Sequence, residues 1–197
     1  MGWGAWPLFS WGVASCIAQA QARGYGHGMI GYIATAQRGA SDLLIADLAT
    51  RLQSSGIIVA GAVQINSETD RSARCNMDLR VLQAGHIVRI SQSLGPQSRG
   101  CRLDPAGLEE AAGLVEADLG ASAPPHILIV NKFGKHECDG RGFAPAIAKA
   151  LERDIPVILA VSPLNEAAFL AWAGEFAQPV AAIPAQMDAW CRAQIGA

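Results

Sequence analysis

The stretch "GYIATAQRGASDLLIADLATRL", Gly31–Leu52, decides the fold class of this chain. It begins as a short apolar strand, turns tightly at a glycine, and continues as a helix with leucines at a spacing of four. The turn follows the outline of a phosphate-binding loop, G-x-x-x-x-G-K-[ST]. Gly39 and Ser41 keep the second glycine and the hydroxyl, whereas Ala34 replaces the first glycine and Ala40 replaces the lysine.

Such a turn can attract an anion without the lysine, because its backbone N–H groups and the helix N-terminus carry partial positive charge. Arg38 adds a full charge from another direction, and Ser41 is the expected helix cap. The candidate anion-binding residues here are Arg38, Gly39, Ala40 and Ser41. The local sequence alone also fits an ordinary strand-to-helix connection.

The rest of the chain alternates between strands and helices. Further apolar strands are expected at 57–65, 126–130, 156–161 and 179–183, with helices that begin near Phe143, Leu164 and Ala185. This alternation predicts an α/β fold of three layers, with a mostly parallel sheet and helices on both faces.

An antiparallel element interrupts this alternation. Residues 77–82 and 86–91 alternate in polarity on either side of a short turn, which predicts a hairpin around 77–91. Asp104 and Pro105 are a helix start, with Asp104 as the cap, and this helix is expected to run to about Leu119.

Composition limits the classes of function. The 197 residues are 51% hydrophobic and 16% charged, which suits one folded domain, expected at 29–197. The net charge of −2 gives no overall attraction to nucleic acid or to an anionic membrane, and no apolar run is long enough for a membrane span. Five cysteines without C-x-x-C spacing fit reduced thiols in the cytoplasm.

Residues 1–28 are rich in Trp, Gly and Ala. They contain the lipoprotein-like "VASC" and a cleavage-like "AQA", but no basic residue precedes the apolar part. We expect an extension outside the core, explained by a start codon assigned too early with Met29 as the true start. Export through residues 1–28 is the minor alternative.

The segment "NKFGKHECDGRGF", Asn131–Phe143, follows the strand expected at 126–130. Nucleoside-triphosphatases place acidic residues at such a strand end to hold magnesium. This chain has Asn131 and Lys132 there, followed by Lys135 and Arg141, so an anion-binding loop is expected rather than a magnesium site. A solvated loop surface is the competing interpretation.

Two further clusters carry candidate chemistry. Arg99 and Arg102 flank Cys101 just before the helix at Asp104, and their guanidinium groups suit oxyanions. A soft metal or thiol site is a weaker hypothesis, and its candidate residues are Cys75, Cys101, His136 and Cys138. Their spacing does not require a site.

The order of elements resembles that of the small P-loop nucleoside-triphosphatases of the cancer-related NTPase type. The resemblance covers most of Met29–Val161; Gly134, Glu137 and Phe143 match positions of that family's late "DEIG-x-ME…F" segment. It implies a P-loop-NTPase-like fold and a nucleotide with magnesium as cofactor. The acidic strand end and the loop lysine of the family are replaced at Asn131 and Ala40, which describes a degenerate form.

The motifs "RGASD", "CNMDL", "ISQSLGPQSRGCRLD" and "IVNKFGKHECDGRGF" together resemble an uncharacterised bacterial domain family often encoded near molybdate-transport genes. This resemblance implies a role in molybdenum or oxyanion handling, with molybdate as a candidate ligand and a protein partner linked to molybdate transport. It supplies no activity of its own.

Three hypotheses follow. The first is a degenerate P-loop-like protein that binds a nucleotide phosphate or an oxyanion through the residues named above. The second is an active nucleoside-triphosphatase in which Glu137 orients water and Ser41 helps to hold magnesium; whether the protein is an enzyme is left open. The third is the Cys/His metal or thiol site.

Overall fold

The computed structural model describes residues 29–37, 39–67, 76–92 and 103–196. The strands are β1 (Ile30–Ala34), β2 (Val59–Ser67), β3 (Asn76–Val81), β4 (Ile87–Arg89), β5 (Ile127–Phe133), β6 (Val157–Val161) and β7 (Ala177–Pro179). The helices are α2 (Ala40–Ser54), α3 (Pro105–Leu119), α4 (Lys135–Cys138), α5 (Ala144–Glu152), α6 (Glu166–Ala173), the 3₁₀ turn η2 (Gly174–Phe176) and α7 (Pro184–Ile195). The expected extension at 1–28 lies outside the described residues.

The described strands form one sheet in the order β4-β3-β2-β5-β6-β1-β7. β2, β5, β6, β1 and β7 pair in parallel, whereas β3 is antiparallel to both β2 and β4. The sequence prediction of a mostly parallel α/β sheet with an antiparallel hairpin is confirmed. The arrangement is consistent with a P-loop-NTPase-like fold.

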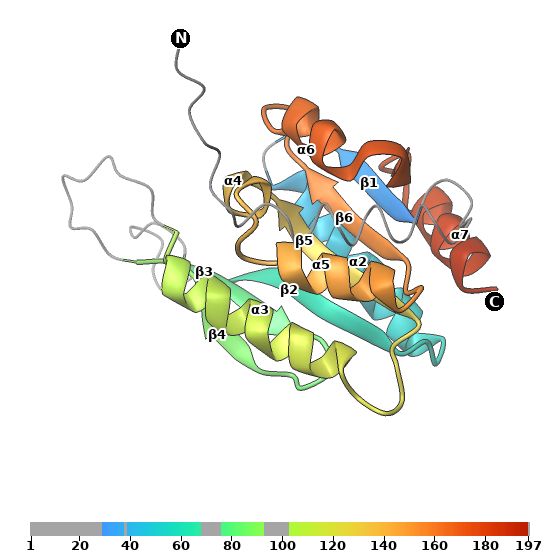
Figure 1. The fold of residues 1–197 in the computed structure, drawn as a ribbon, viewed down its shortest axis with the longest axis horizontal. Coiled ribbons are helices and arrows are strands. Elements are labelled where there is room, and N and C mark those ends of the chain that lie inside the picture. The colour runs from blue at the N-terminus through green and yellow to red at the C-terminus, as the bar shows by residue number, and fades with distance from the viewer. Residues whose placement is uncertain (1–28, 38, 68–75, 93–102, 197) are drawn as a thin grey trace, which may run out of the picture.

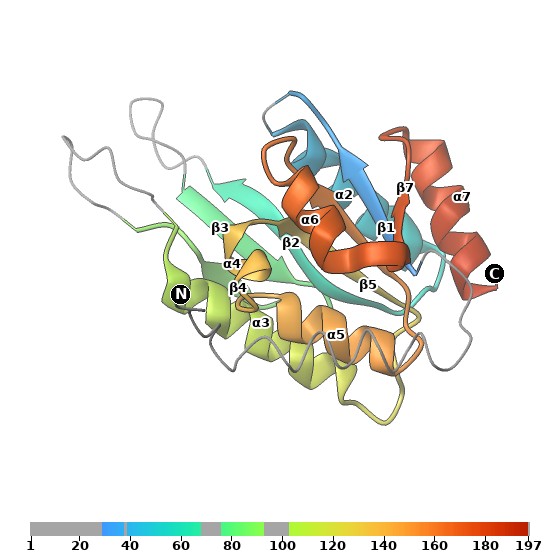
Figure 2. The same cartoon turned by 45° about the horizontal axis from the view of Figure 1, so that its top comes forward.

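Helices cover both faces of the sheet, which gives three layers. α3 and α5 lie together on one face with α6 nearby, and α2 and α7 lie on the other (Figure 1). The turned view in Figure 2 separates these layers. The sheet separates two apolar cores, and alternate residues of β5 contribute to each. Leu128 and Val130 belong to the core on the α3 side, whereas Ile127 and Ile129 belong to the core on the α2 side.

Aromatic rings pack α6 against β1 and β5. The Phe169 ring of α6 lies 5.0 Å from the ring of Tyr32 in β1 and 5.1 Å from that of Phe133 in β5. Such tilted and edge-on pairs stabilise packing beyond the area that they bury. These contacts join α6 to β1 and β5.

Local chemistry explains most element boundaries. The predicted start of α3 is confirmed, since Asp104 Oδ1 accepts a hydrogen bond from the Ala106 N–H at 3.0 Å. Ser41 as the helix cap was wrong: Gly39 occupies the cap with φ of 80°, and Ser41 lies inside the first turn of α2. Glycine adopts this left-handed conformation without the strain that a β-carbon adds.

The last strand was also misplaced. The apolar letters of 179–183 predicted a strand there, but the strand β7 ends at Pro179. Ile183 and Pro184 instead begin α7, because the fixed φ of proline suits a first helical turn.

Candidate functional site

The carboxyl ends of β1, β2, β5 and β6 meet at one edge of the sheet, where ligands bind in open parallel sheets. The turn after β1 reaches α2 through Gly39. Among the residues that the structure describes, no side chain caps the N-terminus of α2. Ser41 and Asp42 in its first turn are each only 6% exposed. Arg38 lies outside the described residues.

Asn131 ties the end of β5 to this turn. Its side chain is buried, and its Nδ2 donates to Asp42 Oδ1 at 3.0 Å. Its Oδ1 accepts the Gln64 backbone N–H at 3.0 Å. Because both ends of the amide are used, Asn131 fixes α2, β5 and β2 relative to one another.

Lys132 brings a positive charge to the same place. Its Nζ lies 2.8 Å from Asp42 Oδ1, and its side chain is 44% exposed. An exposed cation of this kind remains accessible to a ligand, and two of its three N–H groups can point elsewhere. The charge of Lys132 is thus partly balanced by Asp42 when no ligand is bound.

Sequence reasoning missed Asp42. The signal was available: an acidic residue directly after Ser41 lies in the first helical turn, where the helix dipole favours negative charge. What the sequence did not reveal is that Asn131 and Lys132, far along the chain, both reach it.

Glu137, the residue predicted from the sequence to orient water, is held by the backbone of its own loop. It is 4% exposed; its Oε2 accepts the Gly134 N–H at 2.9 Å and its Oε1 accepts the Phe143 N–H at 3.2 Å. Burial raises the pKa of this carboxyl, and the backbone hydrogen bonds oppose that rise. The contacts describe a clasp that closes the loop between β5 and α5.

The remaining basic candidates do not converge on the α2 turn. Lys135 is exposed and lines a hollow beside β5, whereas Arg141 is exposed and pairs with Asp139 of the same loop at 3.1 Å. Arg99 and Arg102 lie outside the described residues.

The metal and thiol hypothesis gains little from the geometry. Within the described ranges, no three His, Cys, Asp or Glu side chains gather as a metal site would require. Burial raises the pKa of the Cys138 thiol and that of Cys191, the latter to about 12, so both are held as thiols. Cys75 and Cys101 lie outside the described residues.

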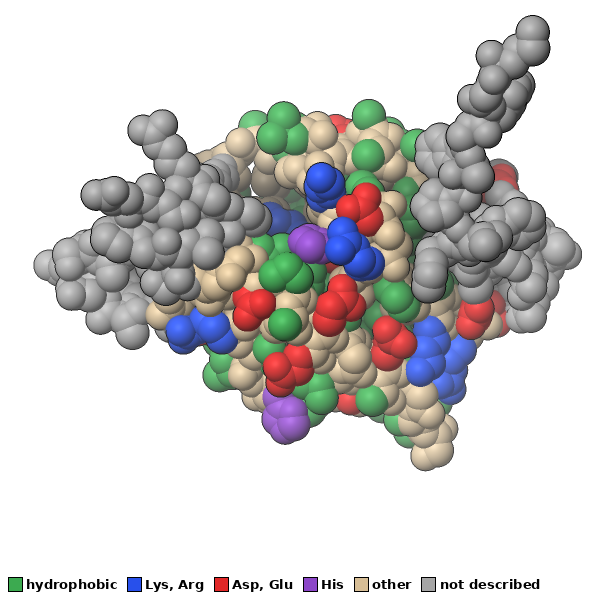
Figure 3. All heavy atoms as spheres, turned by 60° about the vertical axis from the view of Figure 1, so that its left-hand side comes forward, with side chains coloured by type: hydrophobic (Ala, Val, Ile, Leu, Met, Phe, Trp, Pro, Cys, Tyr) green, Lys and Arg blue, Asp and Glu red, His purple; other side chains and the backbone are tan. Residues whose placement is uncertain are grey.

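The hollow beside β5 is a cavity of about 560 Å³ between the β3–β4 hairpin, the start of α3 and the loop around α4. Figure 3 shows this side of the molecule, with basic and histidine side chains close to hydrophobic ones near the middle of the view. The apolar side chains that line it are Met77, Leu79, Ile90, Leu103, Leu108 and Phe143. Its polar lining includes Gln64, Asn131, Lys132, Lys135, His136 and Glu137.

Most of the chain matches one protein family in sequence. Residues 30–190, from β1 into α7, match the family described as "Protein of unknown function (DUF2478)". The chain belongs to this family. The finding agrees with the sequence resemblance to an uncharacterised domain family.

A curated relative is the "Molybdenum import ATP-binding protein ModC 2" of Bradyrhizobium diazoefficiens, which is 30% identical over 151 residues. The match covers 77% of this chain but only 17% of the relative's length. No solved structure matched the chain. Across the described residues, none of the helices combines the length and the apolar character that crossing a bilayer needs.

Proposed function

We propose that the turn between β1 and α2 binds an anionic group, either the phosphate of a nucleotide or a tetrahedral oxyanion such as molybdate. The observation that carries the proposal is the Lys132 ammonium, 2.8 Å from Asp42 in the first turn of α2. A phosphate loop normally supplies its lysine from the start of the helix. Here a positive charge comes from the end of β5, which β6 separates from β1 in the sheet, and Ala40 occupies the usual position of the lysine.

Asp42 does not exclude an anion. Its carboxylate is buried and shared between Asn131 Nδ2 and Lys132 Nζ, so its charge is already compensated inside the protein. Lys132 keeps donors for a ligand, and the helix N-terminus adds backbone dipoles. A charge-assisted hydrogen bond from Lys132 to a phosphate or molybdate oxygen is the main expected contact.

The curated relative supports the choice of ligands to test. Its name records molybdenum import and ATP binding, and these words describe that protein. We propose for this chain an accessory or regulatory role in molybdenum or oxyanion handling, in which ligand binding at the turn is communicated to a protein partner. Because the chain spans only 17% of the relative, the role of the whole relative is not carried over.

Isothermal titration calorimetry with ATP, GTP, phosphate and molybdate tests the proposal, with and without magnesium. We expect binding of at least one of these ligands, weakened about 10- to 100-fold by Lys132→Met, because a hydrogen bond to a charged group contributes about 1.5–3 kcal/mol. Methionine keeps an apolar stem in place of the lysine stem.

Arg192→Ala is the matched control, since it removes one positive charge from α7, near the opposite end of α2. It should bind like the wild type. The proposal fails if no ligand binds at millimolar concentration, or if both variants lose binding equally while thermal melts show them folded. Phosphate release in the same samples tests the nucleoside-triphosphatase alternative.

A further inference from the structure

The cavity beside β5 adjoins the α2 turn and shares Asn131 and Lys132 with it. Its lining comes from β2, β3, the start of α3, the end of β5 and the α4 loop, and no residue of 35–37 or 39–42 is part of it. Its volume of about 560 Å³ lies in the range of small-molecule sites, about 300–1,000 Å³. It is therefore large enough for a ligand of its own.

The lining of the cavity combines two kinds of side chain. Leu79 of β3, Leu108 of α3 and Phe143 before α5 are apolar and each at most 7% exposed. The basic residues Lys132 and Lys135 also belong to the lining. Met77 and Leu103 of the same lining are only half-buried, so they leave apolar surface accessible. Covering such surface with a ligand is favourable, and the two cations suit an anionic head.

His136 adds a directional group. Its Nδ1 atom is buried and has no hydrogen-bond partner among the residues that the structure describes. A buried nitrogen without a partner costs free energy, and a bound water or ion is one way to satisfy it. The half-buried ring keeps other atoms accessible, and these are the atoms that can contact a ligand. His136 lines the cavity between Lys135 and Glu137.

We propose that this cavity binds a small organic anion, with an apolar ring or chain against Leu79, Leu108 and Phe143 and one carboxylate or phosphate head. Lys135 and His136 bind the head. Glu137 is not available for it, because both of its oxygens accept backbone hydrogen bonds. The hydrogen bonds of Glu137 to the Gly134 and Phe143 N–H groups hold the loop that places His136 and Phe143 in the cavity lining.

This site does not depend on the function proposed for the α2 turn, although Lys132 lies between them. Lys132 lines the cavity and also contacts Asp42. A head group that draws Lys132 toward the cavity weakens its contact with Asp42, so anions at the two sites are expected to oppose each other.

Three probes of nearly equal size test the proposal by calorimetry: 1-naphthoate, 1-naphthyl phosphate and neutral 1-naphthalenemethanol. We expect at least one anion to bind at least about tenfold more tightly than the alcohol, which corresponds to one charge-assisted contact. Lys135→Met and His136→Ala should remove this preference and leave binding of the alcohol unchanged. The two anions show whether the head site prefers carboxylate or phosphate.

A second variant tests the apolar side. Leu103 lines the cavity and is half-buried, so Leu103→Trp fills space with little change to the deep core. It should block all three naphthyl probes and leave molybdate or phosphate binding at the α2 turn intact. Arg192→Ala serves again as the control for charge.

The inference is overturned if no naphthyl probe binds at millimolar concentration, or if Lys135→Met, His136→Ala and Leu103→Trp all bind the anionic probes like the folded wild type. Failure of the α2-turn proposal gives a different pattern. In that case naphthoate or naphthyl phosphate binds and responds to these variants, while ATP, phosphate and molybdate do not bind.

Discussion

The Glu137 carboxyl shows what a single residue contributes at this edge of the sheet. It was expected to orient water for hydrolysis, and that role stays a prediction. Its geometry has another consequence, because a nearly buried carboxyl that accepts two backbone N–H groups fixes the loop 134–143. The same geometry requires glycine at position 142. The φ of Gly142 is 58°, and a β-carbon there would lie 2.4 Å from Glu137 Oε1.

Glu137→Gln is predicted to lower stability by about 1–3 kcal/mol at acidic pH, because the amide keeps one acceptor and turns an N–H group toward a backbone donor. The raised pKa means that folding disfavours the ionised carboxyl. Its contribution to stability is full below the ordinary value of about 4.5 and is lost as the pH rises through the raised pKa. The stability difference between wild type and variant should therefore shrink with rising pH.

Urea unfolding between pH 4 and pH 8 measures this difference. Glu109→Gln is the matched control, since the exposed Glu109 carboxylate accepts the Gly142 N–H at 2.8 Å in the same loop. It should change stability little. Parallel pH profiles for wild type and Glu137→Gln would contradict the prediction.

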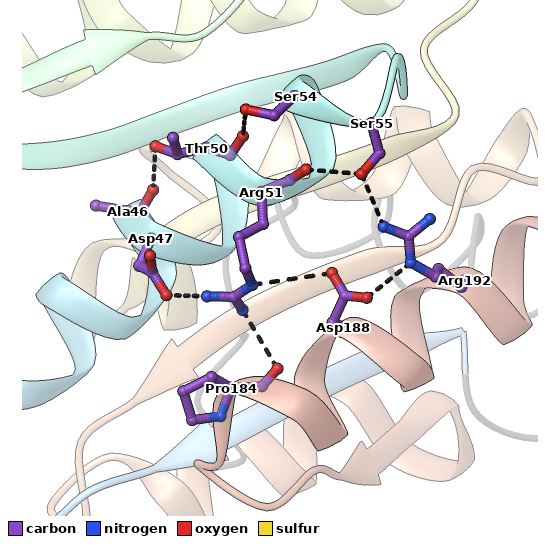
Figure 4. Close-up of polar contacts among 9 residues, drawn as sticks. All are labelled: Ala46, Asp47, Thr50, Arg51, Ser54, Ser55, Pro184, Asp188 and Arg192. Atoms are coloured by element: carbon purple, nitrogen blue, oxygen red, sulfur yellow. Dashed lines mark hydrogen bonds and ion pairs between the residues drawn. The ribbon is translucent and has the colours of Figure 1, made fainter.

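Elements in this fold are joined by contacts that local sequence does not display. Arg51 of α2 donates to Asp47 and to the Pro184 carbonyl oxygen at 3.2 Å, and Arg192 of α7 contacts Asp188 at 2.7 Å (Figure 4). Arg192 also reaches the hydroxyl of Ser55 at the end of α2. Each exposed pair contributes little alone, and together these contacts join α7 to α2 beside the buried Met187 and Cys191.

At Gly61 of β2, the backbone of β5 leaves no room for a β-carbon. Its φ is 119°, and an added β-carbon would lie 1.8 Å from the Ile129 carbonyl oxygen. Gly61→Ala is predicted to destabilise the protein by several kcal/mol, on the order of 4, because strand pairing and strain are both affected. Urea unfolding gives the free energy of unfolding.

Gly56 provides the comparison, since it also has a positive φ, 79°, but nothing within 4 Å of an added β-carbon. Gly56→Ala should cost only about 1–2 kcal/mol, the strain of a left-handed residue. Equal losses in the two variants would show that the approach of β2 to β5 is not the dominant effect.

At the scale of the whole molecule, burial predicts an order of local stability. Ile127–Val130 of β5 and Val157–Leu159 of β6 are fully buried at the centre of the sheet. β4 and β7 are three-residue strands at its edges with exposed side chains. Stability is not uniform across a fold, and edge elements with little buried area open first.

Native-state hydrogen exchange should therefore show the slowest amides in β5 and β6, at rates near those of global unfolding. Amides of β4 and β7 should exchange through local opening, with little dependence on dilute denaturant. Slow exchange in β7 that matches β6 would contradict this order, and would mean that α7 and β7 open only with the core.

The sequence alone determined the α/β class, the hairpin around 77–91 and the capped start of α3, because hydrophobic periodicity and capping act within a few residues. It also located the polar segments that follow two of the strands, at 35–41 and 131–143. It misplaced Ser41 as a cap and the last strand at 179–183, since a left-handed glycine and a proline at a helix start depend on the chain path.

Only the tertiary structure decided which polar side chains meet. It placed Lys132 and Asn131 on Asp42, turned Glu137 into the loop backbone, and kept Arg141 with Asp139. The physical reason is distance along the chain: ion pairs and hydrogen bonds at the carboxyl edge join loops that only the parallel order of strands brings together. The lysine missing from the turn was readable from one short stretch, whereas the charge proposed to replace it was visible only in the fold.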